Sequence, residues 1–69
     1  MGEGGDGLNR LKEVRESRGV SQEKLAELSG ISRQTISKIE TDPEFNAKVD
    51  TIKRLADALD VSFHDIFLA

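Results

Sequence analysis

The chain of 69 residues contains no cysteine, which excludes disulfides and thiolate-bound zinc, and its length leaves room for one domain with one modest core. No apolar run approaches the ~20 residues that cross a bilayer, and the N-terminus lacks the basic and apolar regions of a signal peptide, so we expect a cytoplasmic protein. The net charge is −3, but residues 8–40 hold seven Lys and Arg against five Glu, whereas residues 41–69 hold three against six Asp and Glu.

The start of the chain predicts a tail followed by a helix. Residues 1–7 are rich in glycine and acidic, which is typical of a flexible tail. Apolar residues recur at the helical spacing over Leu8–Arg18, with Leu11 and Val14 on one face. Gly19 is placed to end this helix.

Two short amphipathic segments then follow back to back. The first, Ser21–Ser29, opens with a serine that can accept hydrogen bonds from the free N–H groups of a helix start. Gly30 can adopt the left-handed conformation that ends a helix and lets the chain reverse sharply. We expect the buried face of this first segment to consist of Leu25, Ala26 and Leu28.

The second segment, Ser32–Glu40, carries the strongest functional signal. Ser32 can cap it, and Ile36 and Ile39 lie one turn apart on an inward face. The outward face therefore holds Arg33, Gln34, Ser37 and Lys38. Arg, Gln and Lys can reach base edges in the DNA major groove, so the helix pair favours DNA binding over an ordinary solvated surface.

The rest of the chain predicts two further helices. A loop over residues 41–48 is expected to fold Phe45 onto the core. The fourth helix is expected from Val49 or Asp50 to Leu59, with Val49, Ile52, Leu55, Ala56 and Leu59 on one face. Ser62 and Asp65 resemble a capping box for a brief last helix with the apolar residues Phe63, Ile66 and Phe67.

These motifs resemble the helix-turn-helix domain of the phage lambda and 434 repressor and Cro family, which includes bacterial regulators of the xenobiotic-response-element type. The similarity extends over Leu8–Phe67 and is carried mainly by the stretches Gly19–Glu40 and Leu55–Phe67. It implies an all-α fold, a compact five-helix lambda-repressor-like bundle over residues 8–69. It also implies that a bacterium or a phage encodes the protein. Ser32–Glu40 would be the recognition helix.

The resemblance also assigns roles to single residues. It implies base contacts by Arg33, Gln34 and Lys38, a peripheral contact by Ser37, and positions near the groove edge for Ser32 and Thr35. It implies a phosphate contact by Gln22 and a structural ion pair between Arg15 and Glu40. The chain departs from the family pattern after Glu40, where Asp42 and Glu44 would repel phosphate, so the loop contacts are expected from Asn46 and Lys48.

The resulting prediction is a sequence-specific regulator of transcription that binds double-stranded DNA. A repressor that binds a near-palindromic operator as a homodimer is favoured. The subunits are expected to meet through Phe63, Ile66 and Phe67. The alternatives are an antitoxin-type autoregulator and a protein-interaction module that retains the fold. No enzyme, cofactor or metal is expected, because the serines have no nucleophile–base arrangement and His64 has no partner ligand.

Overall fold

The structure is a computed structural model that describes residues 10–42 and 44–66. Over these residues it contains five short helices. They are α1 (Leu11–Ser17), α2 (Gln22–Ser29), α3 (Arg33–Thr41), α4 (Val49–Leu59) and α5 (Phe63–Ile66). The prediction of an all-α fold with five helices is thereby confirmed over these residues. The tail over residues 1–7, the helix start at Leu8 and the apolar Phe67 lie outside the described residues.

The predicted serine caps fix three helix starts. The hydroxyl of Ser21 accepts from the N–H of Lys24 at 3.0 Å, and that of Ser32 accepts from the N–H of Thr35 at 3.1 Å. At α5, the Asp65 carboxylate accepts from the backbone N–H of Ser62 at 2.9 Å and from its hydroxyl at 3.1 Å, which forms the carboxylate half of the expected capping box. These two hydrogen bonds lower the pKa of Asp65. The Asp65 N–H donates to the Ser62 carbonyl at 3.0 Å, so the Ser62 hydroxyl does not accept from it.

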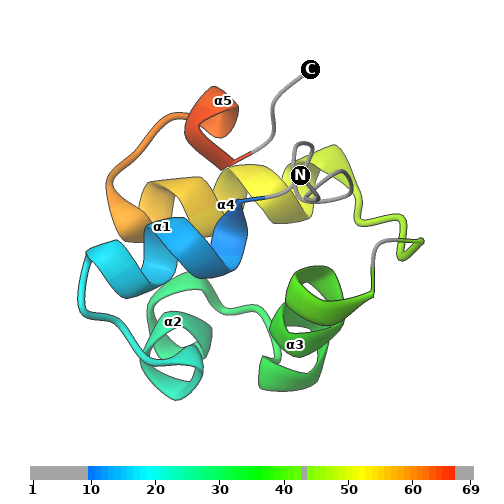
Figure 1. Cartoon of the computed structure of the whole chain (residues 1–69), viewed down its shortest axis with the longest axis horizontal. Coiled ribbons are helices and arrows are strands. Elements are labelled where there is room, and N and C mark those ends of the chain that lie inside the picture. The colour runs from blue at the N-terminus through cyan, green and yellow to red at the C-terminus, as the bar shows by residue number, and fades with distance from the viewer. Residues whose placement is uncertain (1–9, 43, 67–69) are drawn as a thin grey trace, which may run out of the picture.

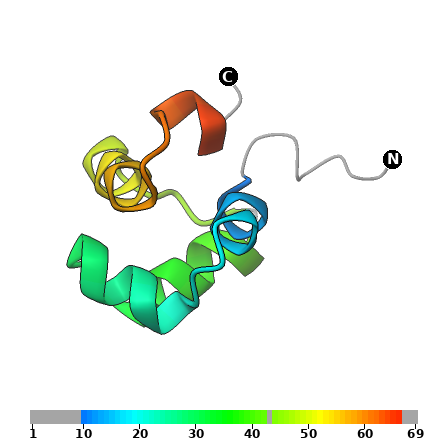
Figure 2. The same cartoon turned by 90° about the vertical axis from the view of Figure 1, so that its left-hand side faces the viewer.

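The core is a single apolar cluster to which every helix contributes. α2 packs against α3 and α4, α4 packs against α5, and α1 contacts both α3 and α5. Figures 1 and 2 show α2 and α3 at one end of the bundle and α5 at the other, with α1 and α4 between them. The buried apolar residues are Leu11, Leu25, Ile36, Ile39, Ile52, Leu55, Ala56, Leu59 and Ile66.

Three apolar residues that were predicted to be buried are exposed. Leu28 is 52% exposed because the inward face of α2 follows Leu25 and Ser29, which leaves Leu28 on the solvent side. Val49 is 61% exposed, since it lies one turn before the buried part of α4 and no described element covers it. Phe45 is 37% exposed.

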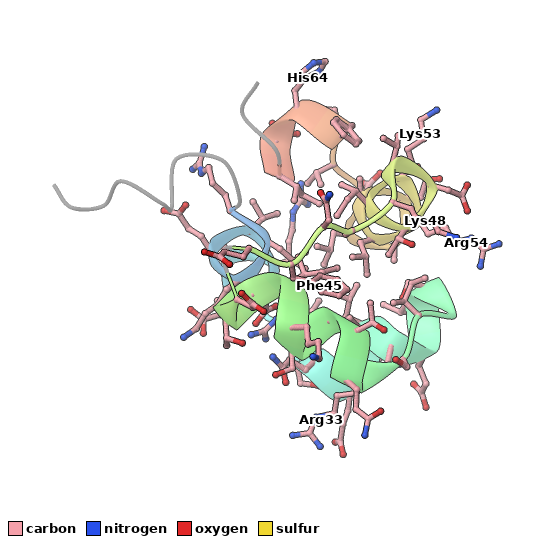
Figure 3. All side chains as sticks on the ribbon, turned by 90° about the vertical axis from the view of Figure 1, so that its right-hand side faces the viewer. Arg33, Phe45, Lys48, Lys53, Arg54 and His64 are labelled. Carbon is pink, nitrogen blue, oxygen red and sulfur yellow. The ribbon has the colours of Figure 1, made fainter. Side chains whose placement is uncertain are left out.

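The position of Phe45 follows from a tight turn after α3. The N–H of Phe45 donates to the carbonyl of Asp42 at 3.1 Å, and the N–H of Glu44 donates to the Asp42 carboxylate at 3.0 Å. These bonds close a turn directly after α3, and Phe45 follows it on the loop that leads to α4 (Figure 3).

The first helix also starts later than predicted. Arg10 has a non-helical backbone, and its N–H donates to the carbonyl of Ile66 at 2.7 Å. Arg10 is therefore tied to α5, and the helix begins only at the next residue, Leu11.

Candidate nucleic-acid interface

The turn between α2 and α3 sets the geometry of the interface. Gly30 has φ +76°, the left-handed conformation that favours glycine, and its N–H donates to the carbonyl of Ala26 at 2.9 Å. The N–H of Ile31 donates to the Ser29 hydroxyl at 3.1 Å, and Ile31 packs against the core. These contacts reverse the chain within three residues and hold α3 across α2.

The outward face of α3 is polar and available for contacts. Arg33, Gln34 and Lys38 are exposed, whereas Ile36 and Ile39 are buried beneath them. Neither Arg33 nor Lys38 forms an ion pair with any residue that the structure describes. Figure 3 shows Arg33 at the end of the molecule farthest from α5 and pointing away from the other helices. The first turn of α3 carries no acidic residue that would repel DNA phosphates from its positive end.

The other predicted residues of α3 are less exposed. Thr35 and Ser37 are half-buried, and Ser32 is exposed. The Ser32 hydroxyl donates to the Thr35 hydroxyl at 3.0 Å while it accepts from the Thr35 N–H, so the two side chains hold each other. Their positions beside Arg33 place them at the edge of the exposed face.

Arg15 and Glu40 form an ion pair that ties α1 to α3. The Arg15 Nε lies 2.7 Å from Glu40 Oε2, and Nη2 lies 3.1 Å from Oε1, so the contact is bidentate. The Glu40 side chain is 1% exposed and the Arg15 side chain 9%. The hydrogen bond that Arg15 donates to Glu40 raises the pKa of the Arg15 guanidinium, although burial opposes this increase. A third N–H of Arg15 donates to the carbonyl of Val20 at 2.7 Å, which anchors the turn before α2.

Gln22 belongs to the same network. Its Nε2 donates to Glu40 Oε1 at 3.0 Å, and the side chain is half-buried at the first position of α2. Sequence reasoning missed this contact, as well as the Val20 contact, because the partners lie on different elements and no local spacing links them. Gln22 therefore sits where the resemblance places it, at the start of α2, with part of its amide engaged inside the protein.

The predicted loop contacts lie apart from α3's first turn. Asn46 and Lys48 are exposed, and Lys48 precedes the first turn of α4 without a side-chain cap. Figure 3 places Lys48 beside α4, well away from Arg33. The acidic residues Asp42 and Glu44 are exposed in the same loop. The structure thus gathers the residues of α3 on one face and leaves the loop residues at its margin.

Two other kinds of site, a metal site and a membrane-spanning helix, are absent from the described part of the chain. Over residues 10–42 and 44–66, no group of His, Cys, Asp and Glu side chains is placed to hold a metal ion. None of the described helices combines the length and apolarity needed to span a bilayer.

The fold and this face define a helix-turn-helix domain of the class found in transcription regulators. A family model for helix-turn-helix domains (HTH_3) matches residues 11–66. The chain therefore belongs to that family, and the resemblance to the lambda repressor and Cro type is confirmed.

Individual relatives agree with this assignment. A putative HTH-type transcriptional regulatory protein of Methanocaldococcus jannaschii is 49% identical over 51 residues, which are 74% of this chain and 16% of that protein. The controller protein C.AhdI of a restriction-modification system from Aeromonas hydrophila has a similar crystal structure, with a TM-score of 0.77 and 40% identity over 84% of this chain and 86% of its own.

The complex of SinR with SinI contains a similar domain, with a TM-score of 0.74 and 32% identity over 81% of this chain and 54% of that one. SinR is a transcriptional regulator of Bacillus subtilis. The chain spans only 16% to 51% of the length of the curated relatives that it matches.

The buried ion pair yields a prediction on stability. In Arg15→Met, the Glu40 carboxylate stays buried without a counter-charge, so we expect the free energy of unfolding to fall by about 3 kcal/mol. The double variant Arg15→Met/Glu40→Leu removes both charges and should recover most of this loss. Urea denaturation monitored by circular dichroism measures the free energy of unfolding of the parent chain, the single variant and the double variant.

The exposed pair between Arg54 and Asp50, at 3.6 Å, provides the control. Because water screens it, Arg54→Met should lower the free energy of unfolding by less than about 1 kcal/mol. Equal losses in Arg15→Met and Arg54→Met would contradict a special role for the buried pair.

Proposed function

We propose that this chain binds double-stranded operator DNA in a sequence-specific manner and represses transcription, in the cytoplasm and without catalysis. The observation that carries the proposal is the outward face of α3, where Arg33, Gln34 and Lys38 are exposed over a buried Ile36 and Ile39. An exposed cation without an internal partner loses no protein contact when it binds DNA. The membership of a family of transcription regulators supports the same function.

Each polar residue of α3 has a matching chemistry on DNA. An arginine can donate two hydrogen bonds to O6 and N7 of guanine, and a glutamine can bond N6 and N7 of adenine. Arg33 and Gln34 are neighbours in the first turn of α3, so they would read adjacent bases. Gln22, the start of α2, Asn46 and Lys48 would contact phosphates and fix the register of the helix in the groove.

A homodimer would place two copies of α3 on one near-palindromic site, about 34 Å apart along the duplex. We place the subunit contact at α5, at the end of the bundle opposite α2 (Figure 2). The sequence analysis assigned Ile66 to this subunit contact. Ile66 is fully buried in the core of its own subunit, so it is not part of the proposed contact. Phe63 is half-buried, and His64 is exposed.

The dimer is tested by sedimentation over a wide range of protein concentration. His64→Glu places like charges together if two copies of α5 meet, so the variant should dissociate at a higher concentration than the parent chain. Lys24→Glu on α2 should leave the dissociation unchanged. A parent chain that sediments as a monomer at every concentration would exclude the dimer.

Base reading by α3 is tested with Arg33→Ala. We expect operator affinity to fall by roughly 5-fold to 150-fold, the equivalent of about 1–3 kcal/mol, with a much smaller loss on random duplex. The operator is selected beforehand from genomic fragments, and fluorescence anisotropy measures both affinities. The matched control Lys53→Ala removes a cation that lies far from Arg33 (Figure 3) and should change neither affinity by more than about twofold. Equal losses on operator and random DNA would contradict base reading.

The acidic loop gives a second prediction. Asp42→Asn/Glu44→Gln removes two negative charges beside the proposed interface, while the side-chain amide oxygen introduced at position 42 can still accept from the backbone N–H at position 44. Affinity for DNA should rise by roughly threefold to tenfold at low salt, and the gain should shrink as salt screens the charges. The control Asp57→Asn/Asp60→Asn removes two charges at the far end of α4. A gain of equal size in the control would show a dependence on net charge alone.

A protein-interaction module is the second candidate. It is favoured by the acidic charge of residues 41–69 and by the SinR–SinI complex, in which a related domain occurs with a protein partner. Titration with genomic fragments separates the two functions, because a DNA-binding domain binds at low salt and loses affinity steeply as salt rises. Absence of binding at low salt would favour the interaction module.

A further inference from the structure

The Glu40 carboxylate has more donors than an ion pair requires. Arg15 donates to both of its oxygens, and Gln22 Nε2 donates to Oε1 at 3.0 Å. The carboxylate is 1% exposed, so these donors supply its surroundings in place of water. Because Arg15 balances its charge, the additional hydrogen bond to Gln22 is not needed to neutralise Glu40.

We infer that Glu40 is a positioning residue for DNA binding, which holds the Gln22 amide so that its second Nε2–H faces a phosphate at the start of α2. The inference rests on the proposed function and adds to it a role for a buried residue that cannot itself touch DNA.

The chemistry of the amide explains why it needs to be held. A glutamine side chain carries a donor nitrogen and an acceptor oxygen, and only the nitrogen can bind a phosphate. Glu40 is a pure acceptor, so it selects the orientation in which Nε2 faces it. One hydrogen of Nε2 is used in this contact, and the other remains for a second acceptor.

The backbone at the start of α2 also offers N–H donors to a phosphate. The first N–H groups of α2 have no partner within the helix, and the Ser21 hydroxyl satisfies only that of Lys24. A phosphate at the start of α2 would accept from a free backbone N–H and from Gln22 together. Arg15 forms a bidentate pair with Glu40, so the positive guanidinium offsets the repulsion between the Glu40 carboxylate and the phosphate.

Glu40→Gln tests the inference, because it shows whether loss of the carboxylate weakens or strengthens DNA binding. The variant has one acceptor oxygen where Glu40 has two, and the charged Arg15 competes for it, so Gln22 is released. Removal of a negative charge alone would strengthen DNA binding. A lost hold on Gln22 instead weakens it, and we expect roughly threefold to tenfold lower affinity for a random duplex, per folded molecule. Urea melts in the binding buffer give the folded fraction of each variant.

The matched control is Glu16→Gln. Glu16 also lies near Arg15, at 4.0 Å, and its removal changes the charge equally without a contact to Gln22. This variant should bind DNA as tightly as the parent chain or more tightly. In the background Gln22→Ala, which itself weakens binding, Glu40→Gln should no longer weaken it further.

A measurement without DNA reports directly on how Glu40 holds the Gln22 amide, and backbone spectra of the same samples show that the variant is folded. In the NMR spectrum of the parent chain, the Gln22 side-chain amide should be ordered and shifted from free glutamine, and in Glu40→Gln it should return to free values. An amide as mobile in the parent as in the variant, or DNA binding that tightens in Glu40→Gln as in Glu16→Gln, would overturn the inference alone. Failure of the parent chain to bind any duplex would overturn the proposed function and this inference with it.

Discussion

The arrangement of the helices depends on one buried carboxylate. Glu40 lies in the last turn of α3 and accepts hydrogen bonds from Arg15 on α1 and from Gln22 on α2. Arg15 extends the network to the carbonyl of Val20, in the turn that precedes α2. Three helices that share only a small core are thereby fixed against one another. A buried ion pair is a weak source of net stability, but an arrangement that separates α1 from α3 without exposing Glu40 to water leaves its charge buried without a partner.

This constraint determines what α3 presents to solvent. With Glu40 held at the end of the helix and Ile36 and Ile39 packed in the core, the rotation of α3 about its axis is fixed. Arg33, Gln34 and Lys38 must then face outward together. The sharp turn at Gly30, with φ +76°, reverses the chain between α2 and α3 and so sets the direction of α3. A helix that contacts base edges needs to be held rigidly by the rest of the domain, because hydrogen bonds to bases depend strongly on the position of the donor and acceptor atoms.

The sequence predicted the local features well and the distant ones poorly. Caps at Ser21, Ser32 and Ser62 involve partners three residues away, so their spacing is visible in the chain. The burial of Leu28, Phe45 and Val49 was predicted wrongly, because exposure depends on which other element covers a residue. The Arg15–Glu40 pair, 25 residues apart, was expected only from the family resemblance, and the Gln22–Glu40 bond was not expected at all. The contacts to DNA stay predictions.

The net charge of −3 shapes how such a domain would achieve affinity. A strongly basic domain is attracted to any duplex through its field, with little regard to sequence. Here the acidic residues of the loop and of α4 would offset most of that attraction, so the cations of α3 would act over a short range. Binding would then depend on contacts that require the correct bases and a correctly placed backbone. Under the proposed function, an acidic chain of this kind would have a lower affinity for random duplex and a higher discrimination between sequences, and it would depend on the few side chains that contact DNA.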